Sequence, residues 1–167
     1  MTARVSSRSA SARSSVLFTR SSHAPLIREW GSGWRSLPAT VTTSMHGKTI
    51  LVVEDHEDTR RALSRVLQRK GFDVTAAGSV AAAMEQFSIN CPDLMICDIG
   101  LSDGTGWDLR DKLHKQGPVR AIAVSGYGMD HDLRRSRDAG FIEHLTKPIN
   151  ISNLEHMIAT TLTSAPR

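Results

Sequence analysis

Three apolar runs of strand length constrain the fold of this chain more than any other feature. They lie at residues 49–53, 93–97 and 119–124, and hydrophobic residues follow one another in them with little alternation. A strand with one face in solvent alternates between apolar and polar residues, whereas a parallel strand covered on both faces is apolar throughout. Weaker strand patterns at 72–76 and 141–146 complete a predicted set of five strands.

Amphipathic segments of helix length separate the predicted strands. Most of their apolar residues recur at the three- or four-residue spacing of a helix face. The apolar positions of the five segments are Leu63, Val66 and Leu67; Val80, Ala83, Met84 and Phe87; Leu109 and Leu113; Leu133 and Ala139; and Ile151, Leu154, Ile158 and Leu162. Gly71 and Gly140 fit the ends of two helices, because glycine takes the left-handed conformation there without strain. The alternation predicts an α/β fold of five βα units.

Charge is unevenly distributed along the 167 residues, whose formal net charge is +4. Residues 1–44 hold six Arg and one Glu, a net charge of +5, while the remainder holds 15 basic and 16 acidic residues, a net charge of −1. The predicted domain is therefore not a nucleic-acid binder. No apolar stretch is long enough for a membrane span, so we expect a cytoplasmic protein without membrane contact. Cys91 and Cys97 are expected to be reduced, buried thiols rather than a disulfide bridge.

The N-terminal segment 1–46 is predicted to be a disordered tail, because it is rich in Ser and Arg and has no helical or strand period. Three interpretations remain open: a reading frame assigned too far upstream, a tail that contacts an acidic partner, or an organelle transit peptide. The first would make Met45 the true start. Trp30 and Trp34 are the features of this segment that composition does not explain. The predicted domain spans residues 47–165.

Reactive polar residues follow four of the five predicted strands. Glu54 and Asp55 follow the first strand, and Asp98 follows the third. Ser125 follows the fourth strand and Lys147 the fifth, whereas the second ends in Ala76 and Ala77. Open α/β sheets build their sites at the carboxyl ends of the strands. Three carboxylates brought together repel one another, and binding a hard cation such as Mg²⁺ relieves that repulsion while keeping the carboxylates ionised.

Four motifs carry a family resemblance. They are Ile-Leu-Val-Val-Glu-Asp at 50–55, Cys-Asp-Ile-Gly-Leu-Ser-Asp-Gly at 97–104, Val-Ser-Gly-Tyr-Gly at 124–128, and Leu-Thr-Lys-Pro at 145–148. With these motifs at these spacings, the sequence resembles the receiver domains of two-component response regulators over residues 47–165. The resemblance implies a flavodoxin-like, doubly wound (βα)5 sandwich with a parallel sheet in the order 2-1-3-4-5. In that order the four polar strand ends converge on one crevice.

The resemblance also implies roles for these residues. Asp98 would accept a phosphoryl group from a histidine kinase, and Mg²⁺ would be bound by Glu54, Asp55, Asp98 and the main-chain carbonyl of Gly100. Ser125 and Lys147 would contact the phosphoryl oxygens, which suits a hydroxyl donor and a compact positive charge. The resemblance further suggests a cis peptide bond before Pro148.

A structural role outside any functional site is the simpler explanation for several of these residues. Asp55 or Asp58 could cap the helix that follows the first strand, and Lys147 could be a surface charge. Asp98 is harder to explain in this way, because Ser102 or Asp103 is better placed to cap the next helix.

Three positions depart from the commonest pattern of the family. Ser102 stands where receivers usually have Pro. His144 occupies the place of the usual aromatic switch residue, so we expect the switch to involve Ser125 and His144 and to respond to pH near the imidazole pKa. Tyr127 could shield an acyl phosphate from water.

The predicted function is signal relay in a phosphorelay, by a switch that catalyses only its own phosphorylation and dephosphorylation. Its expected partners are a sensor histidine kinase or a histidine phosphotransfer protein and an effector protein, with no output domain of its own. The alternative is a pseudo-receiver that binds partners without being phosphorylated. A flavodoxin-like cofactor protein is disfavoured, because the acidic run 54–58 would repel a flavin phosphate.

Overall fold

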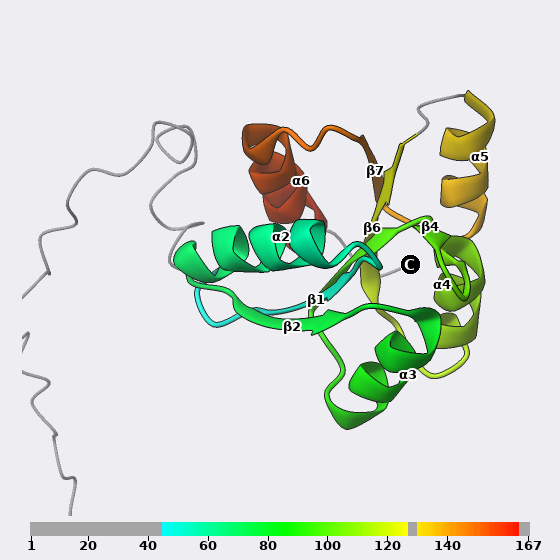
Figure 1. Cartoon of the computed structure of the whole chain (residues 1–167), viewed down its shortest axis with the longest axis horizontal. Helices are drawn as coiled ribbons and strands as arrows, with labels where there is room; N and C mark the ends of the chain where they lie inside the picture. The colour runs from blue at the N-terminus through cyan, green and yellow to red at the C-terminus, as the bar shows by residue number, and fades with distance from the viewer. Residues whose placement is uncertain (1–44, 127–129, 164–167) are drawn as a thin grey trace, which may run out of the picture. The chain divides into compact units, whose positions relative to one another are not determined.

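The structure is a computed structural model that describes residues 45–126 and 130–163 (Figure 1). The predictions for segment 1–44, with Trp30 and Trp34, and the role suggested for Tyr127 lie outside the described residues. Within them, Met45 is buried against the core, with 4% of its surface exposed. The domain boundary at residue 47 stays a prediction.

Helices and strands alternate along the described chain, as the sequence predicts, except that β4 and β5 follow β3 without a helix between them. In order the elements are β1 (Thr49–Val53), α2 (Glu57–Arg69), β2 (Asp73–Ala77), α3 (Val80–Ile89), β3 (Leu94–Asp98), β4 (Gly100–Leu101), β5 (Gly104–Thr105), α4 (Gly106–His114), β6 (Arg120–Ser125), α5 (Asp130–Asp138), β7 (Glu143–Thr146) and α6 (Ile151–Thr163). No described helix is both long and apolar enough to cross a membrane.

A five-stranded sheet in the order β2-β1-β3-β6-β7 forms the centre of the domain, and each neighbouring pair of its strands is parallel. The short antiparallel pair β4 and β5 lies outside this sheet. Strands β6 and β7 are thus the fourth and fifth strands of the sheet. The predicted order 2-1-3-4-5 and the doubly wound fold class are confirmed.

Alternate residues of each central strand enter two different cores. From β1, Leu51 and Val53 join one hydrophobic cluster, which also contains buried residues of α3 and α4. Ile50 and Val52 join a second cluster, which contains buried residues of α2 and α6. Helices therefore cover both faces of the sheet, which is why the strand sequences lack polar alternation.

Left-handed glycines end two helices, as predicted. Gly71 after α2 has φ 88° and Gly140 after α5 has φ 89°. In this region of backbone space a side chain would clash, and glycine avoids the strain. Cys91 and Cys97 are both free thiols, as predicted, and Cys97 is buried. The predicted burial of Cys91 is wrong, because Cys91 lies exposed between α3 and β3.

The predicted cap of the helix after Asp98 is wrong. Thr105 caps α4 by accepting a hydrogen bond from the N–H of Asp108, and Ser102 and Asp103 lie in the turn between β4 and β5. The Asp103 carboxylate instead accepts hydrogen bonds from the N–H groups of Val80 and Ala81, at 2.8 and 3.1 Å. Asp103 thus supplements the N-cap of α3, Ser79, whose hydroxyl accepts a hydrogen bond from the N–H of Ala82.

Asp55 and Asp58 do not cap α2 either. The N-cap residue of α2 is His56, whose side chain makes no capping hydrogen bond. Asp55 therefore keeps its carboxylate available at the end of β1, which removes the simpler explanation of that residue.

Gly106, the first residue of α4, packs directly beneath the end of β3. A Cβ atom placed on Gly106 would lie 2.5 Å from the main-chain oxygen of Asp98. We expect Gly106→Ala to lower the free energy of unfolding by about 1–3 kcal/mol, because backbone must move to relieve the overlap. Urea denaturation measures this change.

Gly117→Ala is the matched control, since a Cβ atom there meets nothing within 4 Å. It should be neutral or slightly stabilising. If both variants unfold at the same urea concentration as the wild type, the close approach of Gly106 to Asp98 has no energetic consequence.

Candidate functional site

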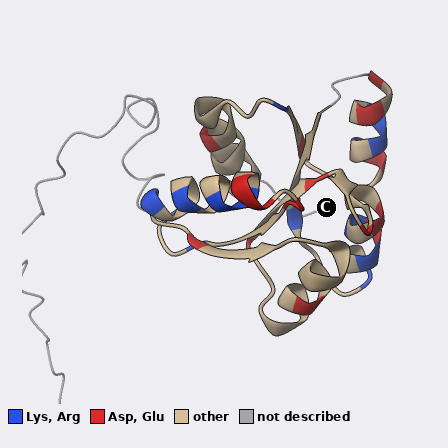
Figure 2. Ribbon diagram, in the orientation of Figure 1, with Lys and Arg blue, Asp and Glu red and all other residues tan. Residues whose placement is uncertain are grey.

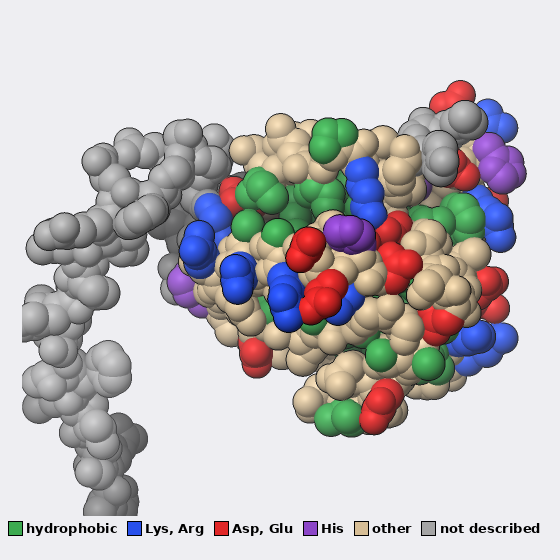
Figure 3. Space-filling view, in the orientation of Figure 1, with side chains coloured by type: hydrophobic (Ala, Val, Ile, Leu, Met, Phe, Trp, Pro, Cys, Tyr) green, Lys and Arg blue, Asp and Glu red, His purple; other side chains and the backbone are tan. Residues whose placement is uncertain are grey.

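An acidic cluster occupies the carboxyl edge of the sheet. Glu54 and Asp55 follow β1 directly, and Asp98 is the last residue of the neighbouring parallel strand β3. Carboxylate oxygens of the three residues lie within 4.8 Å of one another. Figure 2 shows the acidic residues at this edge of the ribbon, and in the space-filling view of Figure 3 acidic side chains gather where α2 begins. The structure brings together the three carboxylates that the sequence singled out.

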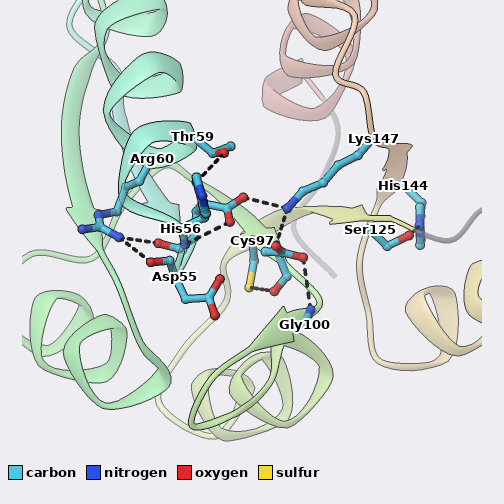
Figure 4. A network of polar contacts seen from close by, with 11 residues as sticks. Asp55, His56, Thr59, Arg60, Cys97, Gly100, Ser125, His144 and Lys147 are labelled. Carbon is cyan, nitrogen blue, oxygen red and sulfur yellow. Dashed lines mark hydrogen bonds and ion pairs between the residues drawn. The ribbon is translucent and has the colours of Figure 1, made fainter.

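Lys147 connects this cluster to the other side of the sheet. It follows β7, and its ammonium lies 2.9 Å from Glu54 Oε2 and 2.5 Å from Asp98 Oδ2 (Figure 4). Glu54 and Asp98 are almost fully buried, with 3% and 7% of their surface exposed. Burial lowers the pKa of Lys147, but hydrogen bonds to Asp98 and Glu54 and the charges of these carboxylates outweigh it, so the pKa is raised. The side chain of Lys147 is 31% exposed, and it acts as the counterion of two buried carboxylates rather than as an unpaired surface charge.

The loop after Lys147 contains a cis peptide bond between Lys147 and Pro148, as the resemblance suggested. On the opposite side of the cluster, the N–H of Gly100 donates a hydrogen bond of 3.1 Å to Asp98 Oδ1. Gly100 therefore lies next to the carboxylate of Asp98.

Arg60 is a residue of this site that the sequence analysis missed. Its Nη1 donates to the main-chain oxygens of Glu54 and Asp55, at 2.7 and 3.2 Å (Figure 4). Gly78 lies directly against its guanidinium, where a Cβ atom would come within 3.0 Å of Nη1. Arg60 thus holds the backbone of the two acidic residues in place from the first turns of α2. Nothing in the helical period distinguishes it from the neighbouring Arg61.

Ser125 and His144 form the other side of the site. Ser125 ends β6, has 6% of its surface exposed, and its Oγ lies 2.8 Å from Nε2 of His144 on β7. Nδ1 of His144 lies 2.9 Å from Oγ of Ser136 on α5. Burial lowers the pKa of His144, and the negative charge of Asp132 opposes this shift. The two residues predicted to form the switch are in direct contact (Figure 4).

The donor set at the acidic edge suits a hard divalent cation. Three carboxylates within one small volume supply oxygen ligands, the type that Mg²⁺ prefers. Sulfur and imidazole ligands, which would favour zinc, do not take part in this cluster.

Comparison with known proteins identifies the kind of domain that carries this site. The family described as the response regulator receiver domain matches residues 50–159. The chain belongs to the response regulator receiver family. Receivers are the switch domains of two-component signalling; histidine kinases phosphorylate them, and they bind Mg²⁺ at an acidic pocket.

Curated relatives of this receiver include longer regulators. It is 31% identical over 119 residues to the response regulator protein PilR of Pseudomonas aeruginosa, covering 71% of this chain and 27% of PilR. It is also 31% identical over 113 residues to the KDP operon transcriptional regulatory protein KdpE of Escherichia coli, covering 68% of this chain and 50% of KdpE. The chain thus spans half or less of the length of these two relatives.

Solved structures agree with the fold. A two-component response regulator from Clostridium difficile superposes with a TM-score of 0.67 at 25% identity, covering 69% of this chain and 95% of that one. The response regulator TrrA from Thermotoga maritima, solved in complex with Mg²⁺ and BeF, has a TM-score of 0.62 at 25% identity, covering 68% of this chain and 98% of that one.

His144 should make the stability of the receiver depend on pH. Because burial lowers its pKa, the unfolded chain binds a proton at His144 at a higher pH than the folded chain does. The free energy of unfolding therefore falls as the pH decreases from about 7 to about 5. His144→Gln, which does not titrate, should have a shallower dependence over this range in urea denaturation series. If the free energy of unfolding of His144→Gln changes with pH as steeply as that of the wild type, His144 has the same pKa in the folded and unfolded chain.

Proposed function

We propose that this receiver accepts a phosphoryl group on Asp98 from a phosphohistidine of a sensor histidine kinase or a histidine phosphotransfer protein. A carboxylate oxygen of Asp98 attacks the phosphorus, the P–N bond to the donor histidine breaks, and its electron pair returns to the donor imidazole. The observation that carries this proposal is the ion pair of Lys147 with both Asp98 and Glu54. It supplies a fixed positive charge at the carboxylate that would carry the phosphoryl group.

The residues around Asp98 suit the same chemistry. Glu54, Asp55, Asp98 and the main-chain carbonyl of Gly100 are the proposed ligands of Mg²⁺, which when bound offsets charge on the transferring phosphoryl group. Lys147 would exchange its bond to Asp98 for one to a phosphoryl oxygen, and the Ser125 hydroxyl would donate to another. The same cluster would later hydrolyse the acyl phosphate, so the domain catalyses reactions on itself and acts as a switch.

Phosphorylation would alter protein contacts. Ser125 ends β6, the strand next to the one that ends in Asp98, and its Oγ contacts His144. Its movement toward a phosphoryl group would therefore change the face formed by α5, β7 and α6. We propose that the effector protein recognises this face.

Intact-mass spectrometry after incubation with acetyl phosphate and Mg²⁺ tests the proposal. The wild type should gain one phosphoryl adduct, and hydroxylamine should remove it, because it is an acyl phosphate. Asp98→Asn and wild type with EDTA should gain none. Asp73→Asn, which changes an exposed carboxylate of the edge strand β2, is the matched control and should behave as the wild type. A folded wild type without any adduct would favour a pseudo-receiver that only binds partners.

Arg60 provides a separate test of the metal site. Arg60→Ala leaves the three carboxylates in the chain but removes the hydrogen bonds to the backbone of Glu54 and Asp55. We expect about tenfold weaker Mg²⁺ binding by isothermal titration calorimetry, since residues that orient ligands contribute on this scale. Arg61→Ala is the control, because Arg61 pairs with Glu57 on the exposed surface and should leave the affinity unchanged. Equal affinities for Arg60→Ala and wild type would contradict the role given to Arg60.

A further inference from the structure

A line of polar side chains runs from the site to helix α4. Oγ of Ser125 lies 2.8 Å from Nε2 of His144, Nδ1 of His144 lies 2.9 Å from Oγ of Ser136, and Nε1 of Trp107 donates to the same Oγ at 3.0 Å. The four residues come from β6, β7, α5 and α4. Figure 4 shows the first contact, on the side of Lys147 away from Arg60.

The direction of these hydrogen bonds follows from what each group can donate. The indole N–H of Trp107 can only donate, so Ser136 accepts from it. Ser136 has 1% of its surface exposed, and a buried hydroxyl proton needs an acceptor. Among residues 45–126 and 130–163, the hydrogen-bond partners of this hydroxyl are Trp107 and His144, so its proton points to Nδ1 of His144.

The tautomer of His144 is then determined. A neutral imidazole that accepts at Nδ1 carries its proton on Nε2, and Nε2–H donates to Oγ of Ser125. Ser125 accepts this bond and keeps its own proton for another acceptor. With the opposite tautomer, Nε2 would accept the Ser125 proton, and the hydroxyl would have nothing to donate to a phosphoryl oxygen.

We propose that His144 is a positioning residue that donates to Ser125, and that Trp107 and Ser136 select the tautomer in which it does so. The Ser125 proton is thereby reserved for a phosphoryl oxygen on Asp98; this last step rests on the proposed function. The hydrogen bonds from Trp107 through Ser136 and His144 to Ser125 form a relay. This relay stands in place of the packing of an aromatic ring at position 144. It also ties the state of Ser125 to α4 and α5, since Arg135 of α5 stacks on Trp107 at 3.9 Å from the ring centre.

Nitrogen-15 NMR of the histidine side chains tests the direction of the relay without any phosphorylation. The His144 signals are assigned by their absence in His144→Gln. The wild type should show the tautomer protonated on Nε2, and Ser136→Ala or Trp107→Phe should increase the tautomer protonated on Nδ1. A wild type protonated on Nδ1, or a tautomer unchanged in both variants, would overturn the proposal.

The rate of phosphorylation by acetyl phosphate tests the consequence for the site. His144→Leu should lower the rate about fivefold, as expected for one hydrogen bond, whereas His144→Gln, whose amide can still donate, should remain within about twofold of the wild type. His114→Leu on the exposed part of α4 is the control and should leave the rate unchanged.

A double-mutant cycle separates the role of His144 from a merely structural one. If His144 acts through Ser125, His144→Leu should have no further effect in the Ser125→Ala background. A fivefold loss that persists there, or a rate for His144→Leu equal to that of the wild type, would overturn the proposal. If the wild type gains no phosphoryl adduct at all, the proposed function fails, and the NMR measurement still decides the direction of the relay.

Discussion

The ammonium of Lys147 is the charge on which the rest of the site depends. Two almost fully buried carboxylates, Glu54 and Asp98, would repel each other at the end of the sheet, and burial of either without a partner would be costly. Lys147 contacts both, so the cluster persists in the folded protein. The contact also joins β1 and β3 to the chain that follows β7, at the far edge of the sheet. Any ligand that competes for one of these carboxylates must therefore also move Lys147, the residue that directly follows β7.

Much of the fold could be predicted from the sequence, because its dominant signal is hydrophobic burial. The runs at 49–53, 93–97 and 119–124 lack polar alternation, and in the structure both faces of these strands are indeed covered. The strand order came from the family resemblance, since no local pattern states which strands pair. The hairpin of β4 and β5 was not predicted, because two-residue strands have no period. Without this hairpin, Ser102 or Asp103 was expected to cap α4. In the structure the chain turns at these two residues, and Thr105 is the N-cap of α4.

The candidate site could be predicted in part. Residues at the ends of parallel strands meet at one edge whatever the helices do, so Glu54, Asp55 and Asp98 could be grouped from the sequence. Side chains that reach the site from other parts of the chain could not be assigned to it from the sequence. Arg60 has the same helical environment in the sequence as its neighbour, and only the fold shows that its guanidinium reaches back to the loop. Ser136 looked like one polar residue of a polar helix, although it is the buried residue of α5.

Helix α5 is attached to the domain in an unusual way. Its sequence is dominated by charged residues, and among its residues Ser136 is the buried one. The other helices are anchored by several apolar side chains, whose contacts resist sliding in every direction. A hydrogen bond, in contrast, is lost or kept according to angle and distance, and is worth little on its own. The hydroxyl of Ser136 thus belongs both to the relay and to the buried side of α5, so a small rearrangement at Ser125 would be passed directly to this helix.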